Sequence, residues 1–156
     1  MALIEKQAIK KYETEGILGI TQLIFDCIVN KNKVPCVIKF IWRELASSKS
    51  PFNRAVAEQI TEIYQSRATK QRDIDYKRLE KASTKIKELY NLNEIQEKIL
   101  KRFEELLKTE TESEGNIINT LKKEFRLETL YIDKTDKTLL CFGAKDYEKV
   151  SIKDLL

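Results

Sequence analysis

No glycine or proline occurs between Phe52 and Glu114. These two residues are the usual interrupters of helices, and the stretch is rich in Lys, Glu and Leu, which are good helix formers. As one straight helix it would be about 95 Å long, too long for a small domain to cover. We therefore expect the stretch to fold back on itself and form a long antiparallel helical hairpin.

We place the turn of this hairpin at residues 91–93. Asn93 followed by Gln96 resembles a capping box, which marks the start of a helix. Apolar residues at helical spacing resume directly after it. The hairpin then joins a first arm over residues 52–90 to a second arm over residues 93–108.

The chain is long enough for one domain, and we interpret residues 1–156 as a single domain. Within the first arm, residues 66–75 carry almost no apolar stripe. This segment either projects into solvent or separates two subdomains. The second alternative gives a helical subdomain over residues 1–65, and a subdomain over residues 76–156 that holds the helical hairpin and a β-hairpin.

Two further helices precede the hairpin. An opening helix over residues 2–14 ends near Gly16, and apolar residues at helical spacing predict a buried helix over 17–29. Pro35 suits the first position of the next helix. A strand over residues 34–40 is the alternative there. Before the first arm, Ser50 and Pro51 give a cap and a first turn.

The C-terminal part changes from helical to strand patterns. Residues 116–125 predict a short helix, and residues 127–142 predict a β-hairpin around a polar turn. Two isolated strands are marginally stable, so this hairpin should pack on the short helix or on a third strand from residues 150–153. The tail could instead form a last helical turn. The fold class is mainly α, a helical bundle with a short C-terminal β-hairpin, and α+β in detail.

Composition indicates a globular protein inside the cell. Hydrophobic residues make up 42% and charged residues 35%, with a net charge of +4. Glu5 and Lys6 stand where a signal peptide needs apolar residues, and no stretch is long and apolar enough for a membrane span. We interpret Cys27, Cys36 and Cys141 as buried, reduced thiols. We therefore expect a cytoplasmic protein with no membrane partner.

The sequence offers few groups for catalysis. It contains no histidine, which is the commonest general base and metal ligand. Phosphate-binding glycine loops, dinucleotide fingerprints and nucleophile elbows do not occur. Cysteines are not clustered, and carboxylates are not paired on one helix face. We therefore expect no catalytic residue, no cofactor and no metal.

One patterned feature is basic. Six side chains of the predicted first arm share a helix face within an arc of roughly 100°. They are Arg67, Lys70, Lys77, Arg78, Lys81 and Lys85. Such a row is typical of proteins that bind a nucleic-acid backbone. The alternatives are an ordinary solvated face, or neutralisation across the hairpin by the acidic residues of 104–114. Lys81 and Lys85 lie nearer the predicted turn and lack acidic residues opposite, so the binding hypothesis rests mostly on them.

These observations favour a non-catalytic helical module for protein–protein interaction, an assembly subunit or adaptor. Its long hairpin would bind a protein partner or a second copy of itself, because long amphipathic helices often leave apolar surface for a partner. The alternative is a protein that binds nucleic acid without sequence preference through the basic face. An enzyme ranks third.

Overall fold

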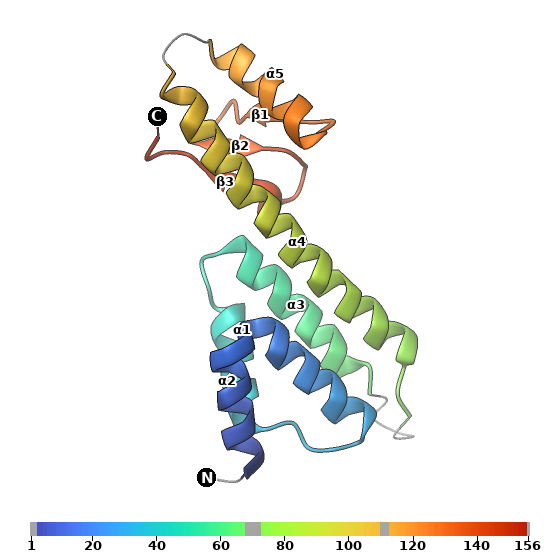
Figure 1. The fold of residues 1–156 in the computed structure, drawn as a ribbon. Coiled ribbons are helices and arrows are strands. Elements are labelled where there is room, and N and C mark those ends of the chain that lie inside the picture. Colours follow the sequence, from blue (N-terminus) through green and yellow to red (C-terminus); the bar gives the residue numbers. More distant parts are fainter. Residues whose placement is uncertain (1–2, 68–72, 110–112, 156) are drawn as a thin grey trace. The chain divides into compact units, whose positions relative to one another are not determined.

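The computed structural model describes residues 3–67, 73–109 and 113–155. These residues form five α-helices, a short 3₁₀ helix and three short strands, which confirms a mainly α fold with a small β part (Figure 1). The elements are α1 (Leu3–Val29), α2 (Cys36–Ala46), α3 (Pro51–Gln65), α4 (Tyr76–Leu107), α5 (Glu114–Phe125), β1 (Tyr131–Ile132), β2 (Leu139–Cys141), η1 (Asp146–Glu148) and β3 (Lys149–Ser151).

The chain divides into two compact units, an N-terminal unit (Met1–Tyr90) and a C-terminal unit (Asn91–Leu156). The boundary falls inside α4. The division suggested by the sequence, at residues 66–75, separates α3 from α4 within the N-terminal unit. Whether the whole chain behaves as one domain stays a prediction.

The predicted turn at residues 91–93 is wrong, and with it the predicted arms over 52–90 and 93–108. Helix α4 continues through these residues from Tyr76 to Leu107. An asparagine inside a helix costs at most about 0.7 kcal/mol relative to alanine, so two of them do not force a break. Gln96 is not a capping residue, because its buried side chain donates a hydrogen bond to the Tyr147 carbonyl.

The chain reverses earlier, between α3 and α4. Arg67 and Ile74 form an isolated antiparallel bridge there, and the first part of α4 lies beside α3 (Figure 1). This is the segment in which the sequence has almost no apolar stripe. Without apolar side chains to bury, a helix loses most of its stabilisation from packing.

In the N-terminal unit, α1 consists of two helical segments that meet at Gly16, where φ is 66° and ψ is −149°. This confirms the two helices predicted on either side of that glycine. The strand alternative at 34–40 is excluded, since α2 begins at Cys36. The buried core of this unit contains Ala8, Ile20, Ile24, Ile38, Ile60, Ile63, Leu79 and Ile86.

Side chains accept hydrogen bonds from backbone N–H groups at helix starts in this unit, including those of α3 and α2. Ser50 Oγ accepts from the Asn53 N–H at 3.3 Å, which confirms the predicted cap of α3. At α2, the Glu5 carboxylate accepts from the N–H groups of Cys36 at 2.6 Å and Val37 at 3.2 Å. Since the first N–H groups of a helix have no partner within it, this contact ties α1 to α2.

The three cysteines are free thiols. Cys27 and Cys141 are buried as predicted, and burial raises the pKa of both thiols. The prediction was wrong for Cys36, which is exposed at the first turn of α2. Its apolar sequence neighbours, including Ile38, point inward instead.

In the C-terminal unit, β1, β2 and β3 form an antiparallel sheet in that order. The register pairs Tyr131 with Cys141 and Leu140 with Val150. This confirms the predicted β-hairpin and, of the alternatives for the tail, the third strand. As expected, the sheet shares its core with α5, and α4 also contributes; the buried residues are Ile99, Phe103, Leu106, Ile117, Leu121, Leu130, Leu140 and Ile152.

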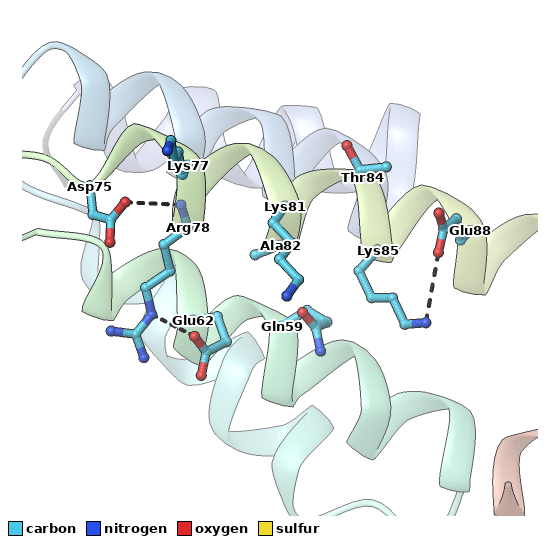
Figure 2. A pocket seen from close by; sticks show the side chains of 10 residues that line it. All are labelled: Gln59, Glu62, Asp75, Lys77, Arg78, Lys81, Ala82, Thr84, Lys85 and Glu88. Atoms are coloured by element: carbon cyan, nitrogen blue, oxygen red, sulfur yellow. Dashed lines mark hydrogen bonds and ion pairs between the residues drawn. The ribbon is translucent and has the colours of Figure 1, made fainter.

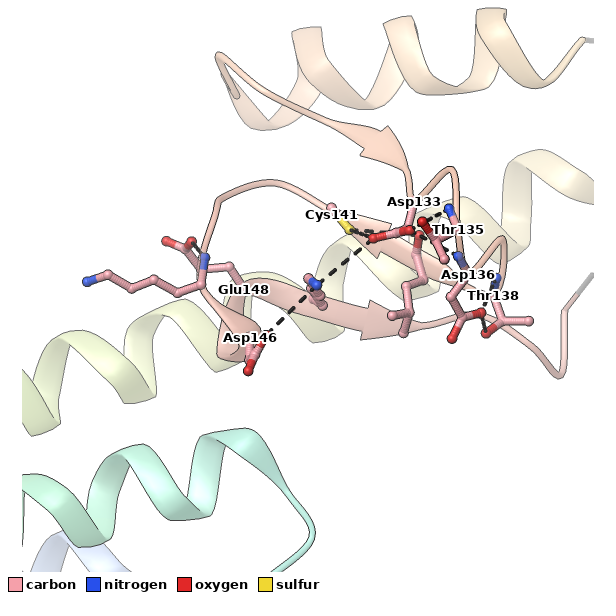
Figure 3. Close-up of polar contacts among 10 residues, drawn as sticks. Asp133, Thr135, Asp136, Thr138, Cys141, Asp146 and Glu148 are labelled. Carbon is pink, nitrogen blue, oxygen red and sulfur yellow. Dashed lines mark hydrogen bonds and ion pairs between the residues drawn. The ribbon is translucent and has the colours of Figure 1, made fainter.

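The β1–β2 turn is held by carboxylates that bind backbone N–H groups (Figure 3). Asp133 Oδ1 accepts from Asp136 N at 3.0 Å and Thr135 N at 2.8 Å. Asp136 Oδ1 accepts from the Thr138 hydroxyl at 2.5 Å and from Thr138 N at 3.0 Å. These hydrogen bonds hold the pKa of both carboxyl groups below its usual range. The turn is therefore built on two ionised carboxylates.

This turn should loosen in acid. A carboxyl group whose pKa is lower in the folded state stabilises that state above its unfolded pKa, and the contribution is lost as pH falls through the folded pKa. When the pH falls below the ordinary range of carboxyl pKa values, we expect the amide resonances of Thr135, Asp136 and Thr138 to shift toward the positions of an unfolded chain. NMR spectra recorded during an acid titration measure this. The double variant Asp133→Asn/Asp136→Asn should give a flat response, and an unchanged acid response in it would contradict the explanation.

None of the described helices combines the length and the apolar character needed to cross a membrane.

Candidate binding groove

An open groove of about 880 Å³ lies between α3 and α4 in the N-terminal unit (Figure 2). Helix α4 contributes a row of basic side chains to it, and α3 contributes polar ones from the facing side. Its lining includes Lys77, Arg78, Lys81 and Lys85 from α4 and Gln59 and Glu62 from α3. Four of the six residues predicted to form the basic face thus line one groove.

The apolar pattern of α4 explains why these side chains reach the groove. Leu79, Ala82, Ile86 and Leu89 are buried, at three- and four-residue intervals. This stripe packs inward, as the sequence predicts, so the neighbouring stripe with Lys77, Lys81 and Lys85 lies beside the packed face. Ala82, a buried member of this stripe, also lines the groove.

Arg78 is held by α3. Its Nε lies 2.5 Å from Glu62 Oε2, and its Nη2 donates to Gln65 Oε1 at 2.7 Å. The hydrogen bond from Arg78 lowers the pKa of Glu62, and the charge of Lys81 adds a smaller contribution in the same direction. The guanidinium is therefore engaged within the unit.

The three lysines differ in their partners. Lys85 Nζ lies 3.7 Å from Glu88 Oε2 on the same helix. Within the part of the chain that the structure describes, neither Lys77 nor Lys81 forms an ion pair. Both side chains are exposed. Asp75, at the start of α4, accepts from the Arg78 backbone N–H at 3.1 Å.

Of the two other predicted residues, Arg67 does not line this groove. Arg67 is half-buried, and its Nη2 donates to the Ile28 carbonyl at 3.4 Å. Lys70 lies outside the described residues. Of the predicted basic face, the structure therefore places Lys77, Arg78, Lys81 and Lys85 in one row on α4.

The predicted acidic partners also differ. Arg78 pairs with Glu62 of α3, and Glu110 and Glu112 of the predicted acidic stretch lie outside the described residues. In that stretch, Glu104 pairs with Lys108 at 3.8 Å and Glu105 with Arg102 at 3.1 Å. Because the chain reverses between α3 and α4, the helix facing Arg78 is α3. Gln59 and Glu62 were not among the predicted site residues, because only a turn placed at residues 66–75 pairs them with the basic row.

The groove contains charged and amide groups with no histidine or cysteine. Over residues 3–67, 73–109 and 113–155, no three His, Cys, Asp or Glu side chains are grouped so that they could hold a metal ion. Comparisons with protein families, curated proteins and solved structures found no match to this chain.

Proposed function

We propose that this chain is a non-catalytic helical interaction module that binds a protein partner through the α3–α4 groove. The observation that supports a protein partner is the mixed charge of the groove. Its described lining includes four cations, Lys77, Arg78, Lys81 and Lys85, and three carboxylates, Glu62, Asp75 and Glu88.

A nucleic-acid backbone has charges of one sign, about one for every 1.7 Å of duplex axis. Such a ligand would meet carboxylates as well as lysines in this groove, and Arg78 would be available only after release from Glu62. A polypeptide carries charges of both signs and apolar groups. Complementary charges of both signs set the register of protein interfaces and exclude wrong partners.

A photo-crosslinking residue in place of Gln59 tests the proposal. Gln59 lines the groove, whereas the neighbouring Glu58 is exposed outside it and provides the matched control. Each variant is expressed in place of the native chain in the cells that normally make it. We expect discrete protein adducts with the variant at position 59, which persist after nuclease treatment, and none with the variant at position 58. Equal adducts at both positions, or none at position 59, would count against a protein partner at this groove.

The row of lysines on α4 favours a second candidate, binding of nucleic acid, which a salt titration separates from the first. With a protein partner, labelled duplex and single-stranded oligonucleotides should show negligible affinity at about 0.15 M salt, where exposed charges are screened beyond about 8 Å. The measurement is fluorescence anisotropy. The opposite result is that the oligonucleotides bind, with a slope of log affinity against log salt concentration that Lys81→Glu/Lys85→Glu lowers by about two. That result would identify the partner as nucleic acid and not a protein.

A further inference from the structure

The groove contains two lysines with a defined spacing, Lys77 and Lys81, and neither forms an ion pair within the part of the chain that the structure describes. Lys77 and Lys81 are one helical turn apart, so their positions on α4 differ by about 6 Å along the axis. Like charges at this spacing repel each other by a few tenths of a kcal/mol. Among the described residues, the nearest acidic groups of the groove already have partners, since Glu62 binds Arg78, Asp75 binds the α4 backbone and Glu88 lies near Lys85.

The length of the lysine row matches a short length of helix. A helix rises about 1.5 Å per residue, so two turns span about 11 Å. The lysine row has the same length, since Lys77 and Lys85 are about 12 Å apart along α4.

Charge complementarity then defines the occupant. Two carboxylates four residues apart on a helix are also about 6 Å apart along its axis, which equals the spacing of the two lysines. On the basis of the proposed function, we infer that the groove binds about two turns of an acidic amphipathic helix of a protein partner. Two carboxylates of this helix, at positions i and i+4, pair with Lys77 and Lys81.

A displayed peptide library tests this occupant directly. The probe is a phage library of alanine-rich helices of about 18 residues, long enough to be helical in water, with randomised residues over the middle two turns. Selection against the full chain at about 0.15 M salt should enrich Asp or Glu at two positions four residues apart. Selection against Lys77→Glu/Lys81→Glu should enrich Lys or Arg at the same two positions.

The matched control is Lys87→Glu. Lys87 is also an exposed lysine of α4, but it does not line the groove. Its variant should select the same acidic pair as the native chain. A synthetic peptide of the selected sequence should lose at least about tenfold in affinity for Lys77→Glu/Lys81→Glu and none for Lys87→Glu. Circular dichroism should show that all variants fold, because exposed charges contribute little to stability.

Several results would overturn the inference: no enriched peptide, enriched peptides without an acidic pair, the same peptides selected by the reversed variant, or displacement of the selected peptide by duplex DNA at this salt concentration. The crosslinks at position 59 distinguish a failure of the acidic-helix inference from a failure of the proposed protein interaction at the groove. Protein adducts there together with a failed selection would reject only the acidic helix. Loss of both would reject the interaction at this groove as well.

Discussion

Replacing Phe103 with alanine should lower the free energy of unfolding of the C-terminal unit by about 3–5 kcal/mol. Its ring has no exposed surface and belongs to the cluster formed by α4, α5 and the sheet. Removal of the ring loses its transfer free energy and leaves a cavity that the neighbours fill only in part. Urea denaturation followed by circular dichroism measures the change, and hydrogen exchange shows where protection is lost.

Two variants serve as controls for this expectation. Phe103→Leu keeps an apolar side chain of intermediate size, so its loss should be smaller. Lys101→Ala removes an exposed side chain two residues away and should change the free energy by no more than about 0.5 kcal/mol. Amides of the N-terminal unit, such as those of Ile60 and Ile63, should keep their exchange rates. A loss for Phe103→Ala no larger than that of Lys101→Ala would contradict the described core.

The second large effect is expected at Gly16, where Gly16→Ala should destabilise the N-terminal unit by about 1–3 kcal/mol. Its φ of 66° with ψ of −149° is a conformation that is essentially restricted to glycine. An alanine can relieve the strain only by changing the angle between the two halves of α1. That change would disturb both the buried Ile20 and the Glu5 contact with α2. Urea denaturation gives the free energy of unfolding.

Gly115 provides the control on the same substitution. It lies in the first turn of α5, has no positive φ, and a Cβ added there meets no atom within 4 Å. Gly115→Ala should therefore be neutral or stabilise the protein by up to about 1 kcal/mol, because alanine restricts the unfolded chain and favours the helix. Equal destabilisation by the two variants would show that the backbone at Gly16 is not the cause.

The parts of the fold that were predictable are those in which a single residue or a short pattern decides the local structure. Gly16 marks the kink of α1, Ser50 caps α3, and the apolar runs within residues 127–142 form two strands around a polar turn. In each case the deciding interaction is local, within a few residues of the chain. The inward stripe of α4 was predictable for the same reason.

The reversal of the chain was not predictable from a breaker residue. Residues 91–93 resemble a helix start, but packing of the flanking apolar positions outweighs the low helix propensity of asparagine. The actual reversal at 66–75 has no glycine or proline and is marked only by missing apolar side chains. This error carried over to the site, because the helix that faces Arg78 depends on where the chain turns. Contacts between distant segments, such as Glu62 with Arg78, follow from the tertiary fold.

The mixed lining of the groove also leaves it close to electroneutrality. Among its described lining residues, four cations stand against three carboxylates, which is an excess of a single positive charge. Acetylation of one lysine would cancel that excess, and acetylation of both Lys77 and Lys81 would reverse its sign, because the modification removes the ammonium charge. Arg78 and Glu62 would remain paired. Modification of two exposed amines would therefore change the sign of the charge that the groove attracts, without any rearrangement of α3 or α4.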